Sequence, residues 1–248
     1  MDRDPSAHSR SQIESESTQK EPIMTRSLAF KTATRDQQSI LTSLEKRTLH
    51  WFAARLPQWV NPDHLTILGF AGMILTGVSY YLAQWDRRML LVGTFFLAVN
   101  WFGDSLDGTL ARYRNRLRPR YGFYVDHVVD AFGILCLIAG FGLSGYMSLT
   151  VAAGFLVAYY LVNIEIYLAT YTIGVFKLSY GIWGPTELRV LLAIGNIALM
   201  FKPYVTIAGH RFLLADVGAV VAIPVLVALA IVATLKNTVR LYNEERLD

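Results

Sequence analysis

Four aspartates lie inside apolar stretches of this sequence, in two pairs with helical spacing. Asp104 and Asp107 share one stretch, and Asp126 and Asp130 share the next. An ionised carboxylate at bilayer depth costs about 2.5–3.5 kcal/mol on insertion scales, so four of them cost about 10 kcal/mol unless something neutralises them. Hard carboxylate ligands favour Mg²⁺, Mn²⁺ or Ca²⁺. We therefore expect the four side chains to hold two divalent cations, Mg²⁺ or Mn²⁺, bridged by a phosphate.

The first pair belongs to a polar helix face with little side-chain bulk at one end. Asn100, Asp104, Asp107, Gly108 and Ala111 follow at i, i+4, i+7, i+8 and i+11, which is one side of a helix. The two small residues would let a bulky ligand approach the backbone closely. Because a short loop should make the two aspartate-bearing helices antiparallel neighbours, we expect all four carboxylates to converge.

Structural salt bridges are the alternative role for these aspartates. No arginine lies in the apolar part of either stretch, and carboxylates within a membrane are usually functional. The sequence therefore favours the metal site.

The composition is that of a multi-pass membrane protein. Hydrophobic residues make up 53% of the chain, charged residues make up 17%, and the mean hydropathy is +0.35. Six apolar stretches each approach the length of about 20 residues that crosses a bilayer. The predicted fold is an all-α integral membrane protein whose six transmembrane helices cover residues 62–84, 88–113, 121–145, 147–172, 185–205 and 212–236.

The remaining segments flank this six-helix catalytic domain, which we assign to residues 61–236. Residues 1–43 have no apolar periodicity and predict a disordered tail without the apolar core of a signal peptide. Residues 44–60 mix basic and aromatic side chains, which is typical of an amphipathic helix on the membrane surface. Residues 237–248 are expected to form a C-terminal tail.

Loop charge predicts the orientation. Arginines crowd the connection after the second stretch, and further basic residues follow the fourth and the last. Both termini and the opening of the aspartate site are therefore expected to face the cytosol, with a bacterial inner membrane as the expected location. Because the basic residues lie in short loops where topology alone would place them, the net charge of +4 does not indicate nucleic-acid binding.

The order and spacing of these residues resemble the signature of the CDP-alcohol phosphotransferase family. The matching segments are Asp104-x-x-Asp107-Gly108-x-x-Ala111-Arg112 and, after nine intervening residues, Gly122-x-x-x-Asp126-x-x-x-Asp130. The spacer is about one residue longer than the commonest form. The resemblance extends to the six spans, to the surface helix and to the opening of the first span.

The resemblance implies transfer of a phospho-substituent from a CDP-linked donor to an alcohol, with release of CMP, in phospholipid biosynthesis. It implies that Asp104, Asp107, Asp126 and Asp130 hold the metals and that Asp130 also deprotonates the acceptor. It also implies a homodimer. The residues expected to contact CDP are Gly108, Ala111, Arg112, Pro62 and Thr66.

Three weaker candidates could serve the acceptor. Arg189 lies just inside the fifth span and is an acceptor-phosphate candidate, and Arg120 is the loop arginine that could reach a substrate phosphate. Glu165 is a lone carboxylate in the fourth span that either lines the acceptor pocket or is paired structurally.

Two other functions would use the same aspartates. An intramembrane prenyltransferase also binds Mg²⁺-diphosphate, although it would have no use for Gly108 or the Ala111-Arg112 pair. A divalent-cation transporter would need acidic residues through both leaflets, whereas all four aspartates lie in the expected cytoplasmic half. The sequence leaves open whether the donor is CDP-diacylglycerol or a CDP-amino alcohol.

Overall fold

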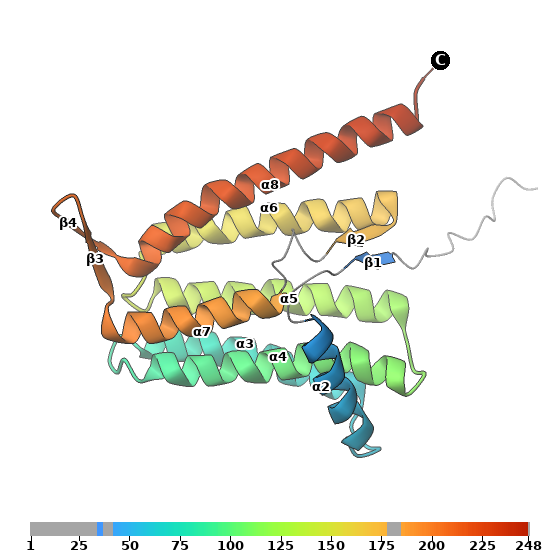
Figure 1. Ribbon diagram of the computed structural model, residues 1–248, viewed down its shortest axis with the longest axis horizontal. Helices are drawn as coiled ribbons and strands as arrows, with labels where there is room; N and C mark the ends of the chain where they lie inside the picture. The colour runs from blue at the N-terminus through green and yellow to red at the C-terminus, as the bar shows by residue number, and fades with distance from the viewer. Residues whose placement is uncertain (1–33, 37–41, 178–184, 248) are drawn as a thin grey trace, which may run out of the picture. The chain divides into compact units, whose positions relative to one another are not determined.

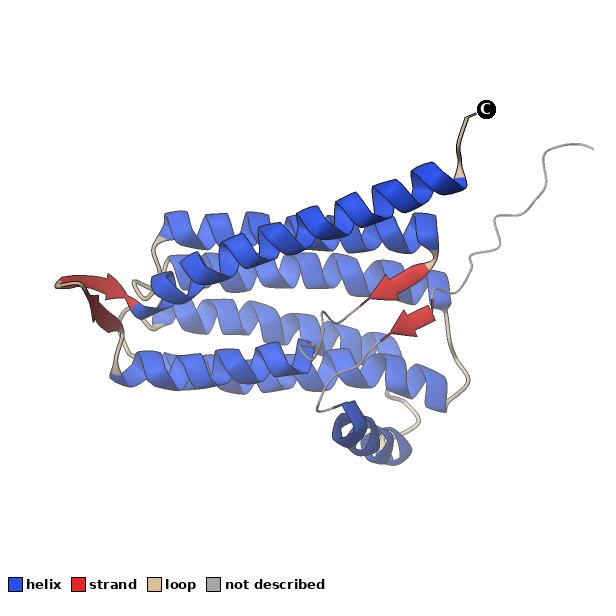
Figure 2. Ribbon diagram, turned by 45° about the horizontal axis from the view of Figure 1, so that its top comes forward, coloured by secondary structure: helices blue, strands red, loops and turns tan. Residues whose placement is uncertain are grey.

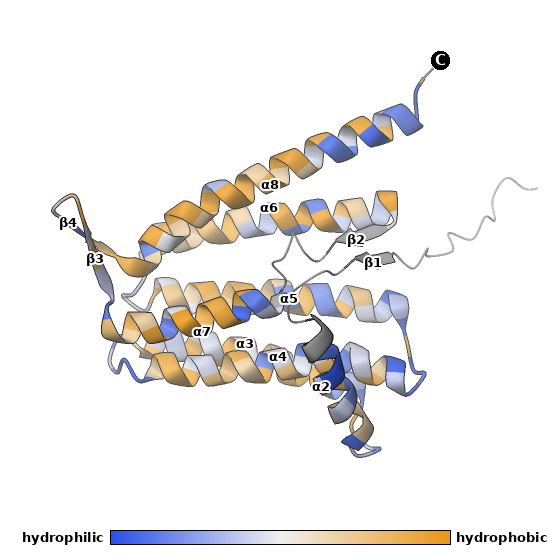
Figure 3. Cartoon of the chain, in the orientation of Figure 1, coloured by the Kyte–Doolittle hydropathy of each residue, from blue (hydrophilic) through white to orange (hydrophobic). Residues whose placement is uncertain are grey.

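A computed structural model describes residues 34–36, 42–177 and 185–247. Five of the described helices are long and apolar enough to cross a membrane, and they lie side by side (Figure 1). Apolar residues dominate their central turns (Figure 3), which confirms the expected all-α membrane architecture. These helices are α3 (Pro62–Leu82), α4 (Met89–Tyr113), α5 (Pro119–Gly142), α6 (Leu149–Ile173) and α8 (Leu214–Glu244).

The sixth expected span is a shorter helix. Helix α7 (Pro185–Phe201) has 17 residues, which corresponds to about 26 Å against a hydrocarbon thickness of about 30 Å. It ends four residues before the expected boundary because Pro203 cannot continue a helix. An antiparallel hairpin of β3 (Tyr204–Ile207) and β4 (His210–Leu213) follows, where the sequence predicted only the end of one span and the start of the next.

The last helix is longer than expected. Helix α8 continues to Glu244, well past the predicted end at residue 236, so most of the expected C-terminal tail is helical. An ion pair between Arg240 and Glu244, 2.8 Å apart at i,i+4 spacing, lies in its last turns. The polar residues of this end extend the helix beyond its apolar part (Figure 3).

The surface helix is present but shorter than expected. Helix α2 (Thr42–Arg55) ends five residues before residue 60, shortly before Pro57, and lies crosswise to the long helices (Figures 1 and 2). Leu49 and Ala53 on its apolar side are buried in a cluster that includes Leu106 of α4. The helix is therefore docked on the bundle.

A short strand lies within the expected N-terminal tail. Strand β1 (Thr34–Asp36) pairs in parallel with β2 (Val175–Lys177), which follows α6. These three residues of the segment expected to be disordered are therefore described as a strand. Residues 1–33 and 37–41 lie outside the described residues.

Helix α3 is the centre of the site-bearing part of the bundle. A Cβ atom on Gly103 of α4 would lie 2.5 Å from the Leu65 carbonyl oxygen and the Gly69 nitrogen of α3, so these two backbones approach closely. A Cβ atom on Gly140 of α5 would likewise collide with the Gly77 carbonyl oxygen of α3. Helices α4 and α5 therefore both pack on α3.

This arrangement corrects the expected packing of the two aspartate-bearing helices. Both make their main contacts with α3, and in the described residues they do not pack extensively against each other. The short loop connects α4 to α5, but it does not make the two helices direct packing partners. The aspartates meet in a small cavity that α3, α4 and α5 all border.

Candidate metal site between α4 and α5

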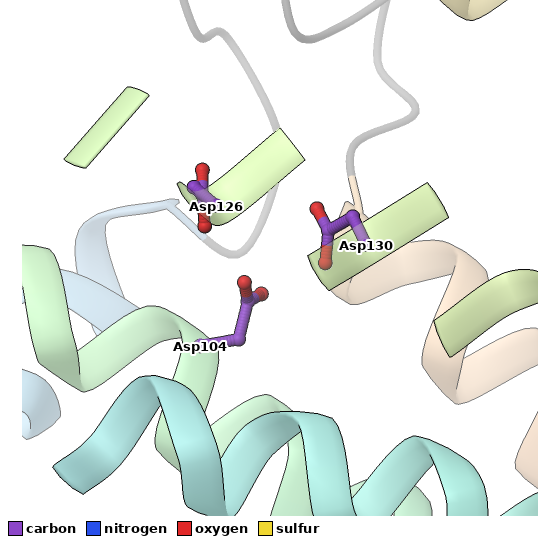
Figure 4. Close-up of side chains that lie close together, drawn as sticks. All are labelled: Asp104, Asp126 and Asp130. Atoms are coloured by element: carbon purple, nitrogen blue, oxygen red, sulfur yellow. The ribbon is translucent and has the colours of Figure 1, made fainter. Parts of the chain in front are cut away.

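Three of the four aspartates form one cluster. Asp104 of α4 and Asp126 and Asp130 of α5 each offer a carboxylate oxygen, and these oxygens lie within 4.8 Å of one another. Figure 4 shows the three side chains directed toward a common space. Opposite oxygen ligands of one hexacoordinate divalent ion are about 4–5 Å apart, so the cluster has a suitable size and chemistry for such an ion.

Helix α3 forms one wall of the small cavity that the aspartates line. Thr66, Gly69 and Phe70 contribute to this wall, and Val129 lies on the α5 side. Gly69 and Phe70 are not among the site residues predicted from the sequence. Their signal was their spacing, because positions three and four after Thr66 share its helix face. The complete lining is Thr66, Gly69, Phe70, Asn100, Asp104, Asp107, Asp126, Val129 and Asp130.

Asp107 lines the same cavity but does not belong to the three-carboxylate cluster. Its Oδ2 accepts a hydrogen bond of 2.6 Å from Thr66 Oγ1 on α3, and its Oδ1 accepts one of 2.5 Å from the Gly108 nitrogen. Four carboxylates were expected to converge. In the structure three of them lie close together, and the fourth, Asp107, is held beside them by its own hydrogen bonds. These bonds leave Asp107 beside the cluster, where a second ion or a ligand could reach it.

Arg189 is brought to the site from α7. Its Nη2 lies 2.6 Å from Asp104 Oδ2, and its Nε donates a hydrogen bond of 2.9 Å to Asn100 Oδ1. Asn100 is buried and donates to the Gly69 carbonyl oxygen, which orients its amide. The salt-bridge alternative is therefore real for Asp104. The sequence of the aspartate-bearing spans does not indicate this ion pair because the arginine comes from another helix.

The residues expected to contact CDP lie along the same end of α4 and α3. Pro62 is the first residue of α3, which confirms the predicted helix start. Ala111 is buried, and Gly108 has the Arg112 guanidinium as its nearest neighbour, 3.5 Å from where a Cβ would lie. Arg112 is exposed and its Nη2 donates to Thr109 Oγ1. The guanidinium thus lies along its own helix at the edge of the site.

Two of the acceptor candidates lie elsewhere. Arg120 is exposed on the first turn of α5. The Glu165 side chain accepts a hydrogen bond of 2.5 Å from Asn237 Nδ2 of α8, which favours the structural alternative for this carboxylate. The pair joins α6 to the polar C-terminal part of α8.

Asp130 also lines a second, larger cavity between α5 and α6. This cavity has a volume of about 280 Å³ and is bordered largely by apolar and aromatic groups. Asp130 therefore has the carboxylate cluster on one side and a mainly apolar space on the other. The lining residues are Asp130, Ala131, Tyr159, Tyr160, Asn163, Ile164 and Tyr167.

Comparison with known proteins places these residues within one family match. A family model described as CDP-alcohol phosphatidyltransferase matches residues 59–236, which include all five apolar helices except the last eight residues of α8. The match thus covers α3 to α7, the three clustered aspartates, Asp107 and Arg189.

Two curated proteins are similar over part of their length. An archaetidylinositol phosphate synthase from Pyrococcus horikoshii is 31% identical over 104 residues, 42% of this chain and 52% of that protein. A phosphatidylinositol phosphate synthase from Streptomyces avermitilis is 34% identical over 98 residues, 39% of this chain and 38% of that protein. The chain thus spans about half or less of the length of these relatives.

Proposed function

Because the chain belongs to the CDP-alcohol phosphatidyltransferase family, we propose that it transfers a phospho-substituent from a CDP-linked donor to an alcohol and releases CMP. The observation that carries this proposal is the convergence of Asp104, Asp126 and Asp130, from two helices, on one small cavity inside the matched region. The prenyltransferase and transporter alternatives rest on the aspartates alone, whereas the family membership favours phosphotransfer.

The three clustered carboxylates would hold one divalent cation, and Asp107 with its neighbours would contribute to a second. Bound Mg²⁺ or Mn²⁺ would neutralise charge on the pyrophosphate and on the leaving CMP. Gly108, Ala111 and Arg112 would contact the CDP moiety, since small residues permit close approach and the guanidinium can bind phosphate oxygens. Thr66 and Pro62 would border the same part of the site.

Asp130 is suited to act on the acceptor hydroxyl. It lines both the carboxylate cavity and the larger cavity between α5 and α6, so an alcohol in the larger cavity could reach it. In the proposed step the hydroxyl oxygen forms a bond to the phosphorus of the donor, the bond from that phosphorus to the CMP oxygen breaks, and Asp130 takes the hydroxyl proton.

The names of the two similar proteins suggest the substrate class. Both are synthases of an inositol phosphate lipid. We propose a CDP-linked lipid as the donor and a phosphorylated polyol as the acceptor, with Arg189 as the cation that meets the acceptor phosphate. Arg189 can do so because its guanidinium already lies at the site, on Asp104.

The proposed setting is a bacterial inner membrane in which the site opens to the cytosol and two copies form a homodimer. The α4–α5 loop and the C-terminal end of α8 lie at the same end of the helices (Figure 1), as the loop-charge prediction requires. The division into an N-terminal tail, a surface helix, a catalytic helix domain and a C-terminal segment belongs to the same proposal.

A CMP-release assay tests this function. Purified protein with Mn²⁺ or Mg²⁺, a CDP-linked lipid and inositol phosphate should release CMP. Asp130→Asn should reduce the rate by about 10²- to 10⁴-fold, the usual contribution of a general base, while donor binding stays largely intact. Asp86→Asn, in the loop between α3 and α4, is the matched control. Normal turnover by Asp130→Asn would show that the base is another group.

A further inference from the structure

Glu45 of the surface helix accepts hydrogen bonds from two other helices through a single oxygen. Its Oε1 lies 3.0 Å from Trp101 Nε1 and 3.2 Å from Ser105 Oγ, both on α4. The same oxygen lies 2.9 Å from Thr186 Oγ1 on α7. One carboxylate oxygen therefore joins α2, α4 and α7.

Two of these contacts are made by residues close in the chain to the Asp104–Arg189 pair. Ser105 follows Asp104 in the chain, and Thr186 precedes Arg189 by three residues, which is about one helical turn. Thr186 is the second residue of α7, in the turn where a helix has the fewest hydrogen bonds of its own. A contact at this point therefore has a large influence on where the first turns of α7, including Arg189, are placed.

Helix α2 is held on α4 by contacts that do not involve Glu45. Leu49 and Ala53, in the second half of the helix, are buried in a cluster with residues of α4. In the connection that follows α2, the carbonyl oxygens of Leu56 and Val60 accept hydrogen bonds from the Arg114 guanidinium. A change at Glu45 should therefore break the connection to α7 without detaching α2.

We propose that Glu45 is a positioning residue that ties α7 to α4 and so holds Arg189 on the Asp104 side of the site. This inference rests on the proposed function for its catalytic consequence, but the tie itself is a structural property. Charge-assisted hydrogen bonds to a carboxylate are stronger than neutral ones, which suits an acidic residue to this role. Glutamine at this position can still accept some of these hydrogen bonds, whereas alanine removes all of them.

A distance measurement tests the tie without reference to activity. Spin labels at Arg47→Cys on α2 and Leu188→Cys on α7, both exposed positions, would be introduced in a Cys136→Ser background of the full chain. We expect a narrow distance distribution with Glu45, a broader or shifted one with Glu45→Ala, and an intermediate one with Glu45→Gln. Identical distributions for Glu45 and Glu45→Ala would overturn the proposal.

Kinetics test the consequence for the site. Glu45→Ala should lower kcat/KM for CMP release by about tenfold to a hundredfold, the scale of an ångström-sized displacement of a positioning group. Glu45→Gln should recover part of this loss, and Glu245→Gln, the same change at an exposed position, should have no effect. If the wild-type chain releases no CMP, the proposed function fails, and the distance measurement still decides on the tie.

A double-mutant cycle separates positioning from general destabilisation. Thr186→Val removes the hydroxyl donor at nearly constant volume and should lower kcat/KM by less than Glu45→Ala. In the Glu45→Ala background it should have no further effect, because the hydrogen bond is already lost. Fully additive losses would show that Thr186 and Glu45 act separately and would overturn the proposal.

Discussion

Asp107 is distinguished from the other site aspartates by its partner on α3. Thr66 Oγ1 donates to its Oδ2 at 2.6 Å, and the Gly108 nitrogen donates to its Oδ1. Together these donors fix the orientation of both carboxylate oxygens beside the three-carboxylate cluster. Orientation of a ligand by a second hydrogen-bonding residue commonly has a measurable effect on metal affinity.

Thr66→Val tests this role at the residue scale. The change removes the donor at similar volume, and a hydrogen bond to a charged group contributes about 1.5–3 kcal/mol. We expect about a tenfold to a hundredfold higher Mn²⁺ concentration for half-maximal CMP release. Thr172→Val, at an exposed threonine at the end of α6, is the control. An unchanged Mn²⁺ dependence in Thr66→Val would show that the orientation of Asp107 is set elsewhere.

At the scale of elements, the close approach of α3 and α4 determines where Asp104 lies. Gly103 directly precedes Asp104, and a Cβ atom there would lie 2.5 Å from backbone atoms of α3. The same side of α3 contributes Thr66, Gly69 and Phe70 to the cavity. The separation of these two helices therefore controls both the stability of the bundle and the width of the site.

Gly103→Ala tests the packing of α3 on α4. Overpacking of this kind typically costs about 1–3 kcal/mol, so the unfolding temperature in detergent and the rate of CMP release should both fall. Gly195→Ala in α7 is the matched control, because nothing lies within 4 Å of its Cβ position. That change should leave stability the same or raise it by about 0.5–1 kcal/mol. Equal effects of the two substitutions would contradict the close packing.

At the scale of the whole molecule, the ends of the long helices differ in character. The β3–β4 hairpin lies at one end, and the α4–α5 loop and the C-terminal end of α8 lie at the other (Figure 1). The arginines of the α4–α5 loop and the last turns of α8 make this second end the basic one. The positive-inside rule therefore predicts that this end faces the cytosol.

Labelling from one side of the membrane tests this orientation. In a Cys136→Ser background, Asn243→Cys near the end of α8 and Thr206→Cys in β3 are exposed positions at opposite ends. An impermeant maleimide should label Thr206→Cys in intact cells or right-side-out vesicles, and Asn243→Cys only in inverted vesicles. The reverse pattern would place the aspartate site on the other side of the membrane.

The sequence alone determined the class of fold and the identity of the acidic residues. Apolar segments of bilayer length and aspartates at helical spacing are local properties, because they depend only on the rise and period of a helix. The resemblance to the family likewise rests on residues at fixed spacing along the chain, namely Asp104, Asp107, Gly108, Ala111, Arg112, Gly122, Asp126 and Asp130. Pro203 is also a local signal because proline ends a helix, yet the predicted fifth span extended past it to residue 205.

Only the tertiary structure decided how these residues are partnered. Arg189 lies 85 positions after Asp104, and Glu45 lies 141 positions before Thr186, so no local pattern indicated either contact. Helix α3, rather than a direct contact of α4 with α5, brings the aspartate pairs together. Such contacts depend on how closely helix backbones approach and on which side chains then meet, and both follow from packing over the whole bundle.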